Sequence, residues 1–250
     1  MVTHFIFMSS SYSLGTRIAL DYIIKDESMQ KQLEEHLHSI IKECGRDVSI
    51  STHMIQAENE NWEAVYNADH FFKDVKVIQS IEEFIKLIQN DRKVQGVDVA
   101  KYILSKIKCT QLKLQKLVYF CYADYLCDTG KELFTDEIFA FKYGPVVDTV
   151  YKNYKSYGYE SIENETKDID SNNISEMPAK SRILFAIDGT EKIISIEKTI
   201  EKYGNMTASE LVDLTHKENS PWSKTDKGSE KNFLPIKLET IKKYHKYETV

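Results

Sequence analysis

The chain has 250 residues, of which 42% are hydrophobic and 11% aromatic, enough for one large folded domain or two smaller ones. Its 39 Asp and Glu outnumber its 33 Lys and Arg, and neither half is basic, which argues against nucleic acid as a partner. Four cysteines without a C-x-x-C pair predict reduced thiols in a cytoplasmic protein, and no apolar run is long enough to span a membrane. These patterns predict no metal site and no cofactor.

The first 93 residues are predicted to form a small α/β domain. Compact or alternating apolar runs indicate strands, and apolar residues three or four positions apart indicate amphipathic helices. The expected elements are a strand at 5–8, a helix through 14–24, a helix from Ser28 to Gly45, a strand at 48–52, a short helix and turn between 62 and 72, a strand at 75–78 and a helix from Ser80. This part shows no family resemblance and is a candidate determinant of partner specificity.

A serine-rich segment lies between the first expected strand and the first expected helix. Its residues Ser9, Ser10, Ser11 and Arg17 are candidates for holding a phosphate, because free backbone N–H groups at a helix start bind anions. Serine also simply caps helices, and the segment lacks the G-x-x-x-x-G-K-[ST] pattern. A phosphate site and an ordinary helix cap are therefore both open at this point.

Residues 94–250 are predicted to form a second, mainly helical domain with a short β element, so that the whole chain is expected to be α+β. The polar segment 90–96 marks the boundary. The expected elements are a helix at 100–107, a long helix between Thr110 and Gly130, a hairpin or extended crossing at 133–141, a helix from Pro145 to Gly158, a mobile loop at 159–182, helices at 193–203 and 207–215, and a helical tail at 238–244.

Two groups of motifs in this second part carry a family resemblance. The first is the run LKLQKLVYF at 112–120, a glycine followed by ELF, and then FAFKYGPVVDTVYKNYKSYG at 139–158; the second is a TH pair followed by a PW pair. Together they resemble the Panacea domain, the SocA-like antitoxin family, over about residues 97–250. The motif residues, most of them expected to be structural, are Leu114, Gln115, Lys116, Leu117, Tyr119, Gly130, Phe134, Tyr143, Gly144, Pro145, Val146, Thr215, His216, Pro221 and Trp222.

The resemblance implies a binding protein rather than an enzyme. Panacea domains act as antitoxins of type II toxin–antitoxin systems that neutralise protein toxins by direct contact, and the SocA type delivers its toxin to a cellular protease. The parts that vary, here 1–93 and 159–182, would then set the choice of toxin. Tyrosines are common at interfaces and equally common in cores; the candidates for contact are Tyr143, Tyr151, Tyr154, Tyr157 and Tyr159.

Several further side chains have two interpretations each. His216 is either a general base or, as we expect, a side chain that fixes a helix end, because no catalytic motif accompanies it. Trp222 is expected to plug the core with its N–H bonded to an acceptor. Lys116 and Lys142 are expected to reach solvent or to pair with an acid, the candidates being Asp124, Asp136 and Asp148.

Two other functions compete with the antitoxin. One is an enzyme that binds a phosphate-bearing substrate at 9–17 and carries a regulatory Panacea-like domain. The other is a phage or mobile-element protein that inhibits a host factor.

Overall fold

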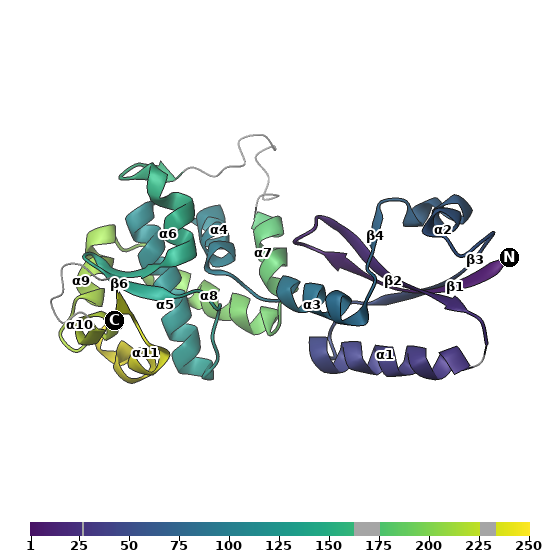
Figure 1. Ribbon diagram of the computed structural model, residues 1–250. Helices are drawn as coiled ribbons and strands as arrows, with labels where there is room; N and C mark the ends of the chain where they lie inside the picture. The colour runs from purple at the N-terminus through teal and green to yellow at the C-terminus, as the bar shows by residue number, and fades with distance from the viewer. Residues whose placement is uncertain (27, 163–175, 226–233) are drawn as a thin grey trace. The chain divides into compact units, whose positions relative to one another are not determined.

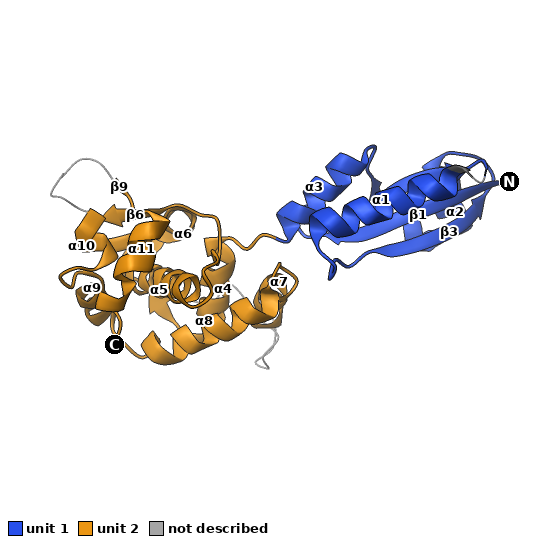
Figure 2. Cartoon of the chain, turned by 90° about the horizontal axis from the view of Figure 1, so that it is seen from below, with its two compact units in different colours: residues 1–92 blue, residues 93–250 orange. Residues whose placement is uncertain are grey.

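The computed structural model describes every residue except 27, 163–175 and 226–233. The chain divides into two compact units, residues 1–92 and 93–250 (Figure 2). Unit 1 is a sheet with helices on both faces, and unit 2 is mainly helical with short strands (Figure 1). The predicted α+β class is confirmed.

Unit 1 is built on a four-stranded sheet in the order β3-β1-β2-β4. The long strands β1 (Val2–Ser11) and β2 (Thr16–Ile24) form an antiparallel hairpin, β3 (Ser51–Ala57) pairs antiparallel with β1, and β4 (Val75–Val77) pairs parallel with β2. Successive side chains of β1 point to opposite faces. Phe7 therefore joins one core and Ile6 the other.

Helices cover both faces of this sheet. On one face lie α1 (Ser28–Cys44) and α3 (Ile81–Asp91), and on the other lies α2 (Trp62–Ala68) with the short 3-10 helix η1 (His70–Phe72). Ser80 caps α3 as expected, because its side chain accepts a hydrogen bond from the backbone N–H of Glu83. The helix–strand order predicted for residues 28–91 is thus largely confirmed, with β3 beginning three residues later than its expected start at 48.

The helix expected through 14–24 is wrong, since these residues form the turn of the hairpin and the strand β2. Ile18 and Leu20 pack on one face while Ala19 packs on the other. A strand that is covered on both faces has apolar residues pointing to both sides. Its sequence therefore lacks the alternation of apolar and polar residues by which a strand with one solvent-facing side is found. Gly15, at φ +65°, makes the turn.

Unit 2 is a set of helices around one long central helix. The helices are α4 (Gly96–Lys106), α5 (Gln111–Thr129), α6 (Asp148–Tyr154), α7 (Glu176–Leu184), α8 (Gly189–Tyr203), α9 (Ala208–Thr215), α10 (Pro221–Thr225) and α11 (Leu238–Tyr244), with 3-10 helices η2 (Lys155–Tyr157) and η3 (His245–Tyr247). The strand β5 (Cys109–Thr110) pairs with β8 (Ser161–Ile162). A second sheet has the order β7-β6-β9 and consists of β6 (Ile138–Phe141), β7 (Gly144–Val147) and β9 (Leu234–Pro235).

Helix α5 is the central element, surrounded by α4, α6, α8, α9 and α11 and by strand β7 (Figure 2). Its predicted ends are confirmed: the Thr110 side chain accepts a hydrogen bond from the N–H of Lys113, and Gly130 ends the helix at φ +76°. Nearly every side chain between Leu114 and Leu126 is buried, including polar ones. Because water is excluded around α5, its polar side chains need partners within the fold.

Two expectations in unit 2 are wrong. The helix expected from Pro145 begins only at Asp148, because 144–147 form β7, where proline is tolerated since β7 is an edge strand. The loop expected at 159–182 contains the first seven residues of α7, which buries Ile183 against the core of unit 2. The rest of that loop, 163–175, lies outside the described residues.

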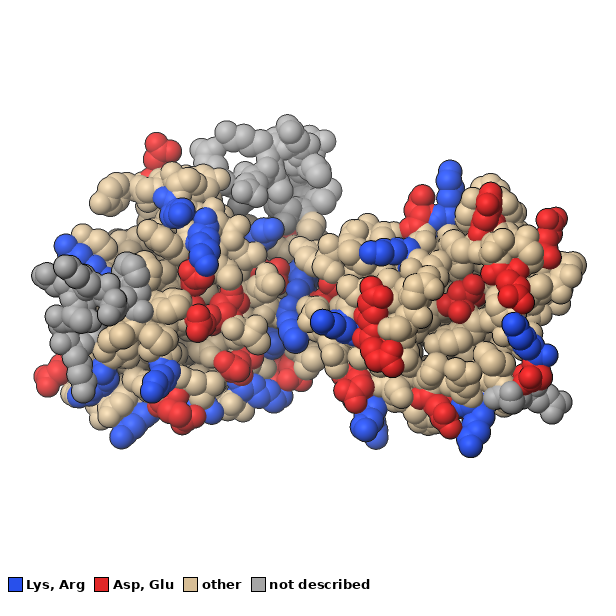
Figure 3. Space-filling model, in the orientation of Figure 1, with Lys and Arg blue, Asp and Glu red and all other residues tan. Residues whose placement is uncertain are grey.

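The surface of each unit mixes both signs of charge. On the face shown in Figure 3, Lys and Arg are interspersed with Asp and Glu over both units. None of the helices in the described part is long and apolar enough to cross a membrane.

Candidate functional site

The two motif groups that are distant in sequence meet at the turn between β6 and β7. Gln115 on α5 accepts a hydrogen bond from the Val147 N–H (2.9 Å) through Oε1 and donates to the Val147 carbonyl (3.5 Å) through Nε2. Lys116 Nζ donates to the Pro145 carbonyl at 2.8 Å. A Cβ atom on Gly144, which has φ +96°, would lie 2.8 Å from Lys116 Nζ and 2.6 Å from Thr215 Oγ1. Only glycine fits there.

Lys116 is fully buried, which corrects the expectation that it reaches solvent or pairs with Asp124, Asp136 or Asp148. Its ammonium group instead binds a backbone carbonyl. Burial lowers the pKa of Lys116 to about 7, against a smaller opposing effect of the Glu248 carboxylate. Lys142 is exposed, with Nζ 5.5 Å from the centre of the Tyr143 ring.

The TH and PW pairs also lie at the β6–β7 turn. His216 follows the last turn of α9, and its ring stacks on Trp222 with the ring centres 3.9 Å apart. Trp222 Nε1 donates to the Phe141 carbonyl at 2.8 Å, which is the acceptor that we expected for it. These contacts support the structural interpretation of His216 and Trp222.

A buried polar network lies further along α5. His245 Nδ1 lies 2.8 Å from Glu248 Oε1, and His245 Nε2 lies 2.8 Å from Asp124 Oδ1. Tyr119 donates to Glu248 Oε1 at 2.6 Å, and Thr199 donates to Asp124 Oδ2 at 2.8 Å. The network thereby joins α5, α8 and the last residues of the chain.

The charge of His245 follows from its two carboxylate partners. Burial acts to lower the pKa of His245, but the hydrogen bonds to Asp124 and Glu248 outweigh it and raise the pKa to about 9. Burial raises the pKa of Glu248, and the hydrogen bond from His245 opposes that rise. His245 is therefore a buried cation at neutral pH.

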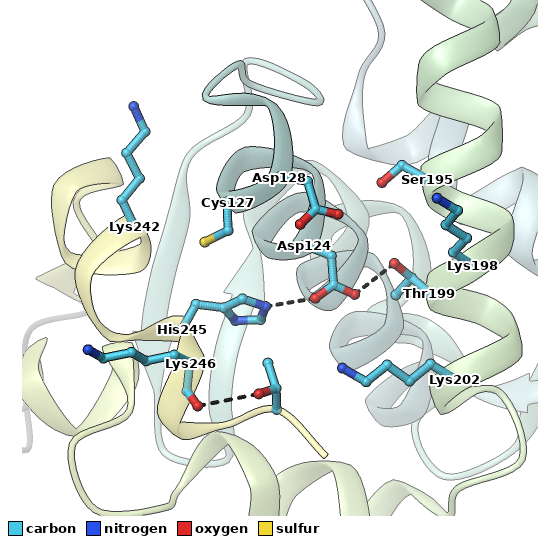
Figure 4. Close-up of a pocket in the computed structure, with 11 residues that line it drawn as sticks. Asp124, Cys127, Asp128, Ser195, Lys198, Thr199, Lys202, Lys242, His245 and Lys246 are labelled. Atoms are coloured by element: carbon cyan, nitrogen blue, oxygen red, sulfur yellow. Dashed lines mark hydrogen bonds and ion pairs between the residues drawn. The ribbon is translucent and has the colours of Figure 1, made fainter.

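A pocket of about 420 Å³ opens beside this network. Its inner wall includes Asp124, His245 and Thr199 (Figure 4). Four lysines also line the pocket, two from α8 on one side and two from α11 and η3 on the other, namely Lys198, Lys202, Lys242 and Lys246. In this concave site the four lysines outnumber the two carboxylates of the lining, Asp124 and Asp128.

The candidate contact tyrosines do not form one exposed surface. Tyr143 and Tyr159 are 55% and 96% exposed, whereas Tyr154 is 4% exposed and belongs to the core. Tyr151 is half-buried against Phe141, and Tyr157 is half-buried beside Tyr154. Tyr154 is therefore no longer a candidate for partner contact.

The proposed phosphate site lacks the helix start on which it depended. Ser9, Ser10 and Ser11 lie in β1, and Ser11 Oγ and the Ser13 N–H both donate to the Asp91 carboxylate. Arg17 on β2 stacks over the Phe71 ring and donates to the Phe71 carbonyl. A carboxylate already occupies the donors of this turn, so it does not favour a phosphate.

Sequence reasoning missed the network and its pocket. His245 and Glu248 are three positions apart in the tail, a spacing that is common on any helix, and 121 positions separate His245 from Asp124. No local pattern could have connected them. Within the described residues, no group of three His, Cys, Asp or Glu side chains is placed to hold a metal ion.

Comparison with known proteins gives two matches. The family model described as "Antitoxin SocA-like, Panacea domain" matches residues 114–223, which lie wholly in unit 2. Antitoxin SocA from Caulobacter vibrioides is 32% identical over 144 residues, which cover 54% of this chain and 72% of SocA. No solved structure matches. The chain therefore belongs to the SocA-like antitoxin family and carries that family's Panacea domain.

Proposed function

We propose that this chain is the antitoxin of a type II toxin–antitoxin pair and that it inactivates a protein toxin by direct contact. The observation that carries the proposal is the similarity to Antitoxin SocA over 72% of that protein. The four cysteines are free, three of them buried, which supports a reducing compartment such as the cytoplasm. We further propose where the toxin binds.

One candidate contact surface is the turn between α7 and α8, which we call the α7–α8 turn (184–187). Three of its four residues are exposed apolar side chains: Leu184 (38%), Phe185 (75%) and Ile187 (45%). Exposed apolar clusters of this kind mark protein interfaces, and aromatic side chains dominate binding energy there. We propose that Phe185 inserts into the toxin, with Tyr143 and Tyr159 as further contacts.

Unit 1 is proposed to contribute specificity. It lies outside the residues matched by the family model, and it has its own core on each face of its sheet. A folded domain joined to a shared scaffold can change partner choice without changing the scaffold.

Co-expression tests the proposal. The neighbouring open reading frame, expressed alone, should arrest growth, and the full-length chain should restore growth and co-purify with its product. Phe185→Asp should abolish rescue, because a carboxylate would be buried without a partner. Leu234→Asp is the control, since Leu234 is another exposed apolar side chain, 37% against 75% for Phe185, on another surface of unit 2. The antitoxin proposal is wrong if the product of the neighbouring reading frame is harmless alone, or if it stays toxic when the chain is present.

The amount of toxin separates two routes of neutralisation. Under direct inhibition, toxin accumulates beside the antitoxin at unchanged levels. Under delivery to a protease, toxin disappears on co-expression and reappears in a host that lacks that protease. We favour direct inhibition, and loss of toxin would replace it with the adaptor route.

A further inference from the structure

We propose that the pocket between α5, α8 and η3 binds a small-molecule anion that carries two or more phosphoryl or carboxylate groups. The pocket is the one described beside His245 and Asp124. This activity is separate from toxin binding and would give the antitoxin a ligand of its own.

The arrangement of the lysines is the first argument. Lys198 and Lys202 are four residues apart on α8, and Lys242 and Lys246 are four residues apart across α11 and η3. Residues four apart on a helix face the same side, so the like charges of Lys198 and Lys202 repel each other. Figure 4 shows these two lysines on one side of the cavity and Lys242 and Lys246 on the other side. An anion in the cavity would be attracted from both sides.

The absence of local acidic partners is the second argument. Within the described ranges, none of these four lysines makes an ion pair. Other lysines of unit 2 do find acids, as Lys131 does with Asp188 (2.9 Å) and Lys180 with Glu197 (3.1 Å). The ammonium groups at the pocket are thus available to a ligand.

The carboxylates at the pocket do not cancel this charge. Asp124 and Glu248 share the buried imidazolium of His245, so these three groups together carry one net negative charge. Asp128 is the one further acid in the lining, against four lysines. The four lysines and His245, set against Asp124, Glu248 and Asp128, leave the site a net charge of about +2, which one monovalent group would only half balance.

Size and donors favour a small molecule over an acidic protein segment. A volume of 420 Å³ lies within the range of about 300–1,000 Å³ that small-molecule sites occupy. The hydroxyl groups of Ser195, Thr199 and Thr249 also line the cavity and can hydrogen-bond to anionic oxygens. A concave site of this volume with such donors suits a compact ligand.

Isothermal titration of the full-length chain with pyrophosphate and with citrate, at constant ionic strength, tests the proposal. Saturable binding of one anion per chain is expected, and the better of the two identifies phosphoryl or carboxylate chemistry. Lys198→Gln with Lys242→Gln should weaken binding at least about tenfold, since each removes a charge-assisted contact. Lys108→Gln with Lys155→Gln, which removes the same charge from exposed sites outside the pocket, should change binding less than about twofold.

Asp128→Asn should change the anion affinity in the opposite direction, because removing a carboxylate from the lining should strengthen binding. Circular dichroism confirms that each variant is folded. No saturable heat with either anion overturns the proposal, as does equal weakening by the pocket and control pairs. Loss of toxin rescue in the pocket variant, without anion binding by the wild type, also overturns it and assigns the lysines to an acidic surface of the toxin.

Discussion

His245 Nε2 lies 2.8 Å from Asp124 Oδ1, so the C-terminal segment of the chain is tied to the C-terminal part of the central helix. The other ring nitrogen is 2.8 Å from Glu248 Oε1. Both nitrogens therefore donate to carboxylates, which makes the ring an imidazolium held between two acids. The C-terminal segment is in this way part of the core of unit 2.

Replacing His245 by Gln should destabilise the chain. The change leaves Glu248 and Asp124 without their shared cation, and breaking a buried ion pair costs about 3–5 kcal/mol. Urea unfolding at pH 7 measures the loss. His38→Gln, at an exposed site on α1, should change the free energy of unfolding by less than about 0.5 kcal/mol. Equal stability of the two variants would contradict the role of the network.

The contribution of His245 should depend on pH. Its pKa is about 9 in the folded chain and 6.5 in its ordinary state, so the folded state holds the proton more tightly. The stabilisation is then fully present below about pH 6.5 and is lost as pH rises through about 9, a change of about 3 kcal/mol. The difference in free energy of unfolding between the wild type and His245→Gln, measured across this range, should shrink accordingly. A constant difference would show that His245 does not titrate as proposed.

Lys116→Met should show the opposite dependence on pH. Burial lowers the pKa of Lys116 to about 7 from 10.5, so the folded chain carries a penalty for the ammonium group at low pH that fades as pH rises through this interval. Methionine removes the penalty and keeps the volume. The variant should therefore gain stability relative to the wild type at pH 6 and lose that gain by about pH 10, as measured by urea unfolding. A gain in stability that grows with pH would contradict the lowered pKa of Lys116.

Gly144→Ala should be far more harmful than Gly130→Ala. Both glycines have positive φ, but a Cβ on Gly144 would lie 2.6 Å from Thr215 Oγ1, whereas nothing lies within 4 Å of one on Gly130. The left-handed conformation alone costs about 1–2 kcal/mol, and the clash adds about 1–3 kcal/mol at position 144. Thermal and urea unfolding should separate the variants by this amount, and equal losses would show that the turn can shift.

The effect of replacing a tyrosine by alanine should depend on how far its side chain is buried. Tyr154→Ala should cost about 3–5 kcal/mol of stability because it leaves a cavity in the core. Tyr159→Ala should leave stability within about 0.5 kcal/mol and weaken toxin binding, since the side chain is 96% exposed. Unfolding and pull-down experiments on both variants check this. Full toxin binding by Tyr159→Ala would remove that residue from the proposed interface.

Local signals predicted the helices of unit 2 well. Thr110 and Gly130 mark the ends of α5 correctly, and Thr207 with Glu210 forms the capping box expected before α9. These features depend on residues within one helical turn, so the sequence contains all that is needed to find them. The same holds for Ser80 at the start of α3.

The errors arose where tertiary contacts decide the structure. The segment at 144–147 is a strand because β6 pairs with it and Gln115 binds the backbone of Val147. Residues 16–24 form a strand because the sheet and helices bury both of its faces. The pocket beside Asp124 also needs residues from α8, α11 and η3, which are distant in sequence, so no single segment of the sequence predicts it.

The meeting of Lys116, Gly144 and Thr215 also limits how this domain can be recombined. A β6–β7 turn taken from another family member keeps the fit when it has glycine at the position of Gly144. A turn with any other residue there would place a Cβ atom 2.6 Å from Thr215 Oγ1 and 2.8 Å from Lys116 Nζ. Grafts of partner specificity between such antitoxins should therefore be made outside this junction.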